Sequence, residues 1–295
     1  MRFGRPLLGL TKTTTLTKGN IGSQLGGRQI SAAAKEESVK RMEELEVAIE
    51  AVKKAGEIVR KYYGKVNASR KSDRSLTTKA DTESENTIKR ILQKRFPDHS
   101  IFGEETGKSG KESDYLWVVD PLDGTTNYAF QNPFFDVSLG LVHKSKPIIG
   151  VVFYPPQNEL FYAEKSKGAY LNDARITVSN ERSFDDSVIA FCHGRDQQSV
   201  TRMISAFSHL KPVNNKVRQL GAAALELCYV ACGRIDAFFM VGMHPWDVAG
   251  GTMILKEAGG KVTDFSGRDF DMRSHDVLGS SPRIYQKLLD ILCDI

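Results

Sequence analysis

Two aspartates three residues apart, Asp120 and Asp123, follow an apolar run and are followed at once by Gly124, Thr125 and Thr126. Carboxylates hold divalent cations such as Mg²⁺, which prefer oxygen ligands and often complete their shell with phosphate oxygens. A Gly-Thr-Thr segment offers backbone N–H groups and hydroxyls that can hold a phosphate. This short segment therefore carries both halves of a metal-assisted phosphoryl-transfer site.

The apolar run over residues 116–119 predicts that Asp120 lies at the carboxyl end of a strand, where α/β proteins place their ligand sites. The carbonyl of Leu122, between the two aspartates, is a further oxygen ligand. A purely structural interpretation is also open, because Asp and Thr are common in capped turns. A plain turn, however, does not require two carboxylates at this spacing.

Three more acidic residues are candidates for the same site. Asp81 begins an expected helix, Glu104 belongs to a Gly-Glu-Glu segment, and Asp247 belongs to Trp-Asp-Val-Ala-Gly-Gly at the start of an apolar helix. Each also has an ordinary structural role, since Glu-Glu after Gly is typical of a solvated turn and Asp is a common N-cap. Together with the motif around Asp120, these acids could belong to one metal-binding site.

The elements that must position these residues follow from the spacing of apolar side chains. The pattern predicts helices over residues 42–63, 81–96, 200–207, 222–232 and 247–258. It predicts strands over 115–119, 137–142, 147–154, 161–163, 169–171, 187–192, 237–241, 261–263 and 277–280, the last two at sheet edges. Strands follow strands in the first half and alternate with helices in the second, which predicts a layered α/β architecture of two lobes, about 42–185 and 186–295.

The chain of 295 residues carries a net charge of +5, which is unevenly distributed. Residues 1–41 hold eight Lys or Arg and two Glu, a net charge of +6, which leaves −1 for residues 42–295. The total therefore does not imply a basic nucleic-acid-binding surface on the folded part. Residues 1–35 contain no acid and are rich in Thr, Ser, Gly and Leu, the composition of a transit peptide; the alternatives are a disordered extension or a start site further downstream, at Met42.

Composition sets further limits on class and location. With 40% hydrophobic and 26% charged residues, the chain is typical of a soluble globular protein. No run reaches the roughly 18–20 apolar residues that span a bilayer, so we expect no membrane span. The four cysteines lack zinc-site spacing and are expected to be reduced thiols. We expect a cytoplasmic protein, or a mitochondrial or plastid one if the N-terminal segment is a transit peptide.

The segments Gly-Glu-Glu, Asp-Pro-Leu-Asp-Gly-Thr-Thr-Asn and Trp-Asp-Val-Ala-Gly-Gly, in this order and spacing, resemble the inositol monophosphatase family of Mg²⁺-dependent, Li⁺-sensitive phosphatases. The resemblance spans about residues 42–290. It implies an α-β-α-β-α sandwich of two fused lobes, similar to fructose-1,6-bisphosphatase, and a homodimer with the active site between the lobes. It also implies hydrolysis of a small phosphate monoester by in-line attack of water, with no covalent phospho-enzyme.

The resemblance assigns the metal ligands residue by residue. Glu104, Asp120 and the Leu122 carbonyl would hold a first Mg²⁺. Asp120 would share a second ion with Asp123 and Asp247, and Glu104 with waters would hold a weaker third.

The catalytic and substrate-binding residues are assigned in the same way. Thr125 with Glu104 would orient the attacking water, and Asp81 would support them. Phosphate and substrate contacts are expected from Asp123, Gly124, Thr125, Thr126, Gly221, Ala222, Ala223 and Asp247.

The choice of alcohol is less constrained by these motifs. The family's inositol-contacting glutamate, seven residues before the tryptophan-linked aspartate, falls on Met240, and a thioether cannot replace a carboxylate in holding a sugar hydroxyl. Inositol 1-phosphate or a related polyol or sugar phosphate is therefore the expected substrate class. Fructose-1,6-bisphosphatase, histidinol-phosphate phosphatase and 3′-phosphonucleotide phosphatase activities stay open as alternatives.

Two other classes of protein, a binding or regulatory protein and a structural calcium module, are alternatives to a phosphatase. A binding or regulatory protein on the phosphatase scaffold would be expected to lose its metal carboxylates, and this chain retains all of them. A structural calcium module fits poorly, because the spacing lacks the alternating oxygen ligands of a calcium loop.

Overall fold

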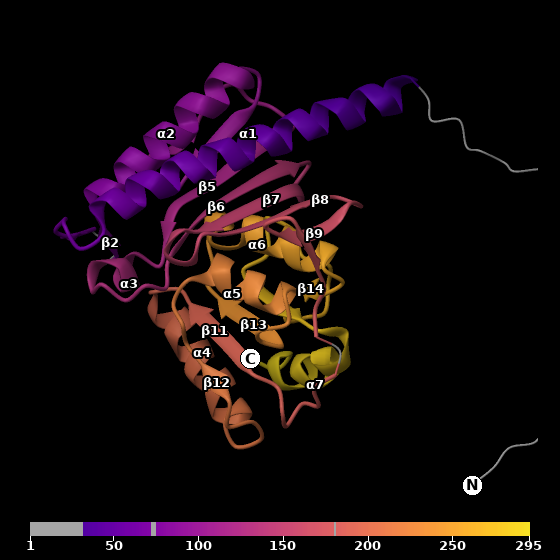
Figure 1. The fold of residues 1–295 in the computed structure, drawn as a ribbon. Helices are drawn as coiled ribbons and strands as arrows, with labels where there is room; N and C mark the ends of the chain where they lie inside the picture. The colour runs from indigo at the N-terminus through magenta and orange to yellow at the C-terminus, as the bar shows by residue number, and fades with distance from the viewer. Residues whose placement is uncertain (1–31, 72–74, 180) are drawn as a thin grey trace, which may run out of the picture. The chain divides into compact units, whose positions relative to one another are not determined.

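The computed structural model of the chain describes residues 32–71, 75–179 and 181–295. The chain divides into two units, Met1–Ser38 and Val39–Ile295, and the architecture below is that of the second unit (Figure 1). The transit peptide or disordered extension expected at the N-terminus lies, up to residue 31, outside the described residues. Within the described part of the chain, no helix has the length and apolar character needed to cross a membrane.

The described elements alternate irregularly along the chain. The helices are α1 (Ala32–Tyr62), α2 (Lys79–Arg95), α3 (Thr125–Ala129), α4 (Gln197–Leu210), α5 (Ala223–Ala231), α6 (Pro245–Glu257) and α7 (Pro282–Leu292), with one 3₁₀ turn, η1 (Pro155–Gln157). The strands are β1 (Ser69–Arg70), β2 (Leu76–Thr77), β3 (Ser100–Gly103), β4 (Gly107–Ser109), β5 (Tyr115–Asp123), β6 (Asp136–His143), β7 (Lys146–Tyr154), β8 (Glu159–Glu164), β9 (Gly168–Leu171), β10 (Ala174–Ile176), β11 (Ile189–His193), β12 (Val217–Arg218), β13 (Ala237–Val241), β14 (Lys261–Thr263) and β15 (Asp276–Ser280).

Most of these strands form two sheets. An eight-stranded sheet has the order β10-β9-β8-β7-β6-β5-β3-β4 and is antiparallel except for the parallel pair β3–β5. A five-stranded sheet has the order β12-β11-β13-β15-β14, in which β11 is parallel to both β12 and β13. The edge position predicted for residues 277–280 is wrong, because β15 pairs with β13 on one side and β14 on the other. The division into lobes near residue 185 stays a prediction.

Helices and sheets stack in five layers (Figure 1). Helices α1 and α2 share one apolar core with the outer face of the eight-stranded sheet. Helices α5 and α6 lie between the two sheets and pack against both. Helices α4 and α7 share a third core with the far face of the five-stranded sheet. This arrangement confirms the α-β-α-β-α sandwich that the family resemblance implied.

Several elements differ from the sequence prediction, and three of these differences are described here. Helix α1 begins at Ala32, ten residues before the predicted start, in a stretch of Ala, Lys and Glu, which favour helices. Strand β5 continues through Pro121 to Asp123, where a loop was expected. Helix α7 was not predicted, although Pro282 at its start and a strongly amphipathic sequence are both helix signals.

Helix α6 lies unusually close to the eight-stranded sheet because glycines face one another across the contact. A Cβ added at Gly150 would lie 2.3 Å from the Gly250 carbonyl oxygen, and one added at Gly140 would lie 2.7 Å from the Ala249 Cβ. No side chain fits between backbones at this separation. Gly250 of Trp-Asp-Val-Ala-Gly-Gly therefore sets the depth at which α6, and the Asp247 in its first turn, dock onto the sheet, whereas Gly251 faces α5.

Gly150→Ala should lower the free energy of unfolding by about 2–4 kcal/mol, because the new methyl group meets backbone that cannot rotate away. Gly107→Ala is the control, since Gly107 has a φ of +67° but nothing within 4 Å of an added Cβ. Its backbone strain alone should cost about 1 kcal/mol. Urea unfolding of both variants measures the difference, and equal losses would contradict the close-packing argument.

Helix α1 carries a buried carboxyl group, that of Glu44. Glu44 is 1% exposed, and neither of its carboxylate oxygens has a hydrogen-bond partner. Its Oε1 lies 3.8 Å from Nε2 of His99, too far for a hydrogen bond. Burial raises the pKa of Glu44 to about 7, against the opposing charges of Lys40 and Arg41, and burial lowers the pKa of His99 to about 4. Near pH 7, His99 is therefore neutral, whereas Glu44 is about half ionised.

Glu44→Gln should stabilise the protein increasingly as pH rises. In the wild type, a folded pKa of about 7 against an ordinary value of 4.5 means that stability is lost between these two pH values, as the unfolded chain ionises first. The neutral amide escapes this loss, so the variant should gain about 2–3 kcal/mol at pH 8 and little at pH 4. Thermal unfolding from pH 4 to 8 tests this, with Glu50→Gln at an exposed position of α1 as control. A pH-independent difference would refute it.

Candidate metal and phosphate site

A bulge in β5 brings the two motif aspartates to one face of the eight-stranded sheet. Asp120 pairs with Ser138 and Asp123 with Asp136, so β5 advances three residues while β6 advances two. In a regular strand, residues three apart point to opposite faces. The one extra residue reverses this, because Ser138 and Asp136 are two apart and share a face.

The acidic residues from four segments come within electrostatic reach of Asp120. Asp120 is 2% exposed, and its pKa is raised well above the ordinary range by burial and then by the Glu104, Asp123, Asp247 and Asp136 carboxylates. The same causes, burial first, raise the pKa of Asp123. The structure thus brings the predicted ligands Glu104, Asp120, Asp123 and Asp247 together at one place.

Asp120 and Asp247 are each oriented by a backbone N–H group. Oδ1 of Asp120 accepts from the Leu122 N–H at 3.0 Å, and Oδ2 of Asp247 accepts from the His244 N–H at 2.6 Å, which caps α6. Burial raises the pKa of Asp247 to about 7, partly offset by that bond and by Arg195. The N-cap residue of α6 is His244, and Asp247 is the third helical residue of its capping box rather than the N-cap considered from sequence. This capping role and the candidate ligand role of Asp247 are compatible, since its other oxygen is left for a second partner.

Asp81 connects the start of α2 to the Thr125 hydroxyl. Its Oδ2 accepts from the Thr78 N–H at 2.8 Å in a capping box, and its Oδ1 lies 3.3 Å from Thr125 Oγ1. Thr125 Oγ1 is also 3.0 Å from the Leu122 carbonyl oxygen. Burial raises the pKa of Asp81 to about 7, since the Thr78 hydrogen bonds only partly offset it.

The donor set fits a hard divalent cation in its chemistry. Among residues 32–71, 75–179 and 181–295, no three His, Cys, Asp or Glu side chains stand close enough to ligate one ion as they are now turned. Several of their oxygens accept hydrogen bonds from backbone N–H groups or from Lys71. The cluster is nevertheless all oxygen, its carboxylates raise one another's pKa, and both oxygens of the fully buried Asp136 lack a hydrogen bond of good geometry. Such an excess of buried negative charge suits Mg²⁺.

Lys71 is the cation that the structure places at the edge of this cluster. Its Nζ lies 3.0 Å from Glu104 Oε1 and 2.6 Å from Glu105 Oε1. Burial acts to lower the pKa of Lys71, but the two glutamates outweigh it and raise the pKa above its ordinary value. The solvated Glu-Glu turn considered from sequence is thus a partly buried ion pair, with Glu104 19% exposed.

The Asp-Gly-Thr-Thr-Asn segment contacts the loop that opens α5. Oδ2 of Asp123 accepts from the Ala224 N–H at 2.8 Å, and Asn127 Nδ2 donates to the Leu220 carbonyl at 2.8 Å. Gly124 has a φ of +83°, and an added Cβ would lie 3.2 Å from both Ala222 Cβ and the Gly221 carbonyl oxygen. Gly221, Ala222 and Ala223, predicted to bind substrate, therefore lie beside the predicted phosphate-binding residues.

Sequence reasoning missed three buried acids around the site. Glu85 of α2 is fully buried and accepts from the Glu105 and Thr106 N–H groups at 2.8 and 3.0 Å, which holds the turn that carries Glu104. Asp136 opens β6, and Glu226 lies in α5. For Glu85 a signal was available, because it falls with Asp81 on one face of α2, at the spacing of buried side chains.

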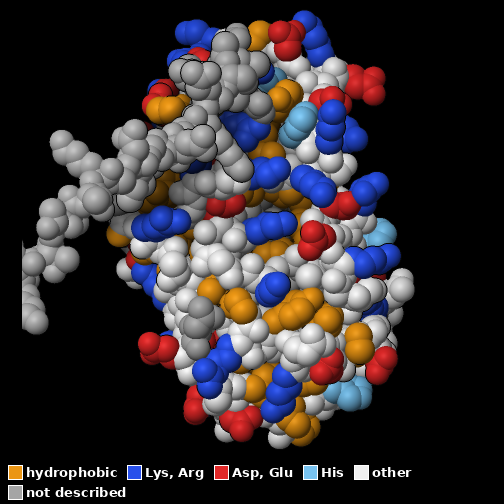
Figure 2. Space-filling model, turned by 90° about the vertical axis from the view of Figure 1, so that its right-hand side faces the viewer, with side chains coloured by type: hydrophobic (Ala, Val, Ile, Leu, Met, Phe, Trp, Pro, Cys, Tyr) orange, Lys and Arg blue, Asp and Glu red, His pale blue; other side chains and the backbone are white. Residues whose placement is uncertain are grey.

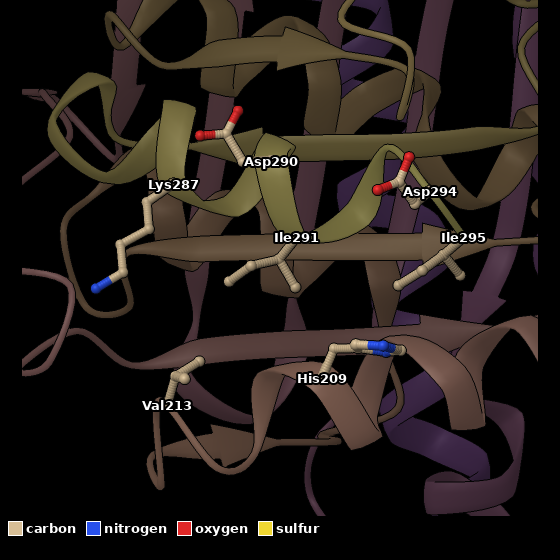
Figure 3. Close-up of a pocket in the computed structure, with 7 residues that line it drawn as sticks. All are labelled: His209, Val213, Lys287, Asp290, Ile291, Asp294 and Ile295. Atoms are coloured by element: carbon tan, nitrogen blue, oxygen red, sulfur yellow. The ribbon is translucent and has the colours of Figure 1, made fainter.

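A cavity of about 450 Å³ lies elsewhere, between the ends of α4 and α7 (Figure 3). Val213, Ile291 and Ile295 give it an apolar lining, and Asp290 and Asp294 lie on its α7 side. None of the predicted site residues lines it. Figure 2 shows one face of the molecule, on which Lys and Arg side chains are interspersed with Asp and Glu.

Lys71→Met should destabilise the metal-free protein at pH 8 by about 1–2 kcal/mol, because Glu104 and Glu105 then stay partly buried without their cation. At pH 4 the loss should shrink, because burial raises the pKa of Glu104 and this carboxylate then binds a proton. Thermal unfolding in EDTA measures both. Lys79→Met is the matched control, since Lys79 forms an exposed pair with Glu83. The same Tm for both variants at pH 8 would contradict the role of Lys71.

Comparisons with known proteins agree with this arrangement. A profile of the inositol monophosphatase family matches residues 40–295. The Nus factor SuhB of Pasteurella multocida (strain Pm70) is 39% identical over 256 residues, which cover 83% of this chain and 94% of that protein. The inositol-1-monophosphatase of Synechocystis sp. (strain ATCC 27184 / PCC 6803 / Kazusa) is 38% identical over 252 residues, which cover 84% and 88%.

Solved structures give the same result. The extragenic suppressor protein suhB from Bartonella henselae aligns with a TM-score of 0.79 and 34% identity, over 84% of this chain and 97% of that chain. The inositol monophosphatase of Thermotoga maritima aligns with a TM-score of 0.78 and 33% identity, over 85% and 97%. The sequence match extends over nearly all of the body, and the fold agrees with it. The chain belongs to the inositol monophosphatase family.

Proposed function

We propose that this chain is a Mg²⁺-dependent phosphomonoesterase that hydrolyses inositol 1-phosphate or a related polyol or sugar phosphate. The observation that carries the proposal is that the carboxylates of Glu104, Asp123 and Asp247 all interact electrostatically with the buried Asp120. Asp123 also continues directly into the Gly-Thr-Thr-Asn segment. The name of the Synechocystis relative, inositol-1-monophosphatase, supports the same class.

In this proposal the oxygen donors divide between two ions. Glu104, Asp120 and the Leu122 carbonyl hold one, and Asp123 and Asp247 join Asp120 around the other. Mg²⁺ would supply the charge that lowers the pKa of a water and offsets the charge of the phosphate. The backbone N–H bonds to Asp120 and Asp247 orient these carboxylates before any ligand arrives.

Thr125 and Asp81 have the geometry to move a proton from the attacking water. The Thr125 hydroxyl has one proton, which it can donate toward Asp81 Oδ1 while a lone pair accepts from the water. Asp81, with a pKa of about 7, can share that proton near neutral pH. We assign Thr125 and Glu104 to orienting the water, Asp81 to acting through Thr125, and the Gly124 and Thr125 amides, with Thr126, to holding phosphate.

In this proposal, the loop of Gly221, Ala222 and Ala223, which lies beside Asp123 and Gly124, binds the alcohol part of the substrate. Met240 lies in β13, pairs with Cys192 of β11 and is 7% exposed. A thioether there offers a hydroxyl only a weak acceptor. The proposal therefore names polyol and sugar phosphates as a class rather than inositol 1-phosphate alone.

Asp120→Asn should lower phosphate release by about 100-fold or more, because an amide removes the charge shared by both ions. Phosphate release is measured with Mg²⁺ over a panel of inositol 1-phosphate, fructose 1,6-bisphosphate, histidinol phosphate and a 3′-phosphonucleotide. Added Mg²⁺ should also raise the Tm of the wild type and leave that of Asp120→Asn nearly unchanged.

Asp264→Asn is the matched control, since Asp264 is a buried aspartate that accepts backbone N–H bonds from Ser266 and Arg268 away from the site. It should retain both activity and the Mg²⁺-induced rise in Tm. Absence of Mg²⁺-dependent release from every ester in the wild type would end the enzyme proposal. Full activity of Asp120→Asn would refute the ligand assignment alone.

A second candidate is a regulatory binding protein on the same scaffold. The observation that favours it is the name Nus factor SuhB, carried by relatives that are 37–39% identical to this chain. A pull-down that Asp123→Asn leaves unchanged, together with absent phosphatase activity, would support this role over catalysis.

A further inference from the structure

Glu226 is a fully buried glutamate whose carboxylate is occupied by donors from two other segments. It lies in the first turn of α5 and is 0% exposed. Its Oε1 accepts from the Leu220 N–H at 2.8 Å, and its Oε2 accepts from the Cys192 thiol at 3.0 Å. Among the residues that the structure describes, no Lys or Arg is hydrogen-bonded to it, and its donors are a loop N–H and a strand thiol. Burying a carboxyl group costs free energy, and its hydrogen bonds to these two donors offset part of that cost.

The loop that Glu226 holds is the one that Asn127 holds from the opposite side. Leu220 donates its N–H to Glu226 and accepts from Asn127 Nδ2 at its carbonyl, 2.8 Å in both cases. Both polar groups of one peptide segment are thus fixed by side chains 99 residues apart in the sequence. Gly221 follows with a φ of +87°, and an added Cβ would meet Asn127 Nδ2 at 3.2 Å. The path of the loop is therefore closely determined up to Ala222.

Removal of the carboxylate would release one of these two attachments. A Leu at position 226 fills a similar volume and suits the apolar helix α5. It would leave the Leu220 N–H buried without an acceptor, which a loop relieves by moving toward water. The Asn127 contact would then hold the loop at one point, so that its backbone could rotate. The position of this loop relative to Asp123, which accepts a hydrogen bond from the Ala224 N–H, would then be less closely determined.

We propose that Glu226 is a positioning residue, which fixes the loop of residues 220–223 so that it binds the alcohol part of the phosphate ester. This inference rests on the proposed phosphatase function for its substrate role, but the attachment of the loop is independent of it. A helix residue thereby controls substrate binding without touching the substrate or the metal ligands.

The test compares Glu226→Leu with Glu226→Gln, which keeps an oxygen for the Leu220 N–H. Amide hydrogen exchange over residues 217–222 should be at least tenfold faster in Glu226→Leu and near wild-type in Glu226→Gln. For the best ester of the panel, Glu226→Leu should raise KM about tenfold and change kcat less than threefold, because uniform substrate binding is lost rather than chemistry. The Mn²⁺ dissociation constant should stay within twofold.

Leu227→Ala is the control for a purely structural effect, since Leu227 is a fully buried neighbour in α5 that packs against Gly251 of α6. An equal KM rise in this variant would overturn the positioning role. Unchanged exchange in Glu226→Leu would overturn the attachment, and faster exchange with unchanged KM would overturn the substrate role. If the wild type releases no phosphate from any ester, the proposed function fails, and the exchange measurement alone decides on the attachment.

Discussion

The contact between the Asp-Gly-Thr-Thr-Asn segment and the loop before α5 is the interaction on which the site depends. Asp123 accepts from the Ala224 N–H, Asn127 donates to the Leu220 carbonyl, and Gly124 allows the two backbones to approach. One partner ends a strand of the eight-stranded sheet and the other begins a helix between the sheets. If this contact shifted, the candidate metal ligands and the candidate substrate loop would no longer share one geometry.

Buried negative charge is the second constraint on this region. Asp120, Asp123 and Asp136 repel one another in a setting that water does not screen, and Lys71 is a cation paired at its edge. Backbone N–H groups also donate hydrogen bonds to these carboxylates, which orients the carboxylates but does not neutralise their charge. A bound divalent cation, as in the proposed function, would neutralise this buried negative charge, which apolar packing cannot do.

The sequence predicted the fold class, the family and most elements, because long apolar periods and contiguous motifs are local signals. It predicted that Glu104, Asp120 and Asp247 would meet, and the structure brings them together. It did not predict Glu85 or Glu226, because a glutamate in a helix is ordinarily solvated, and only the tertiary fold shows which N–H groups it receives. The inner place of β15 was missed for the same reason, since the partners of a strand are not determined by its own residues. The early start of α1 was missed although the Ala, Lys and Glu residues there favour a helix.

The bulge in β5 makes the site depend on a count of residues as well as on their identity. Because β5 carries one residue more than β6 between its two pairings, Asp120 and Asp123 share a face. Deletion of one residue between them would restore regular pairing, conserve every carboxylate and yet turn one of them to the opposite side of the sheet. The number of residues between the two aspartates, odd or even, is therefore a requirement of this motif in its own right, and a comparison of residue types alone does not reveal it.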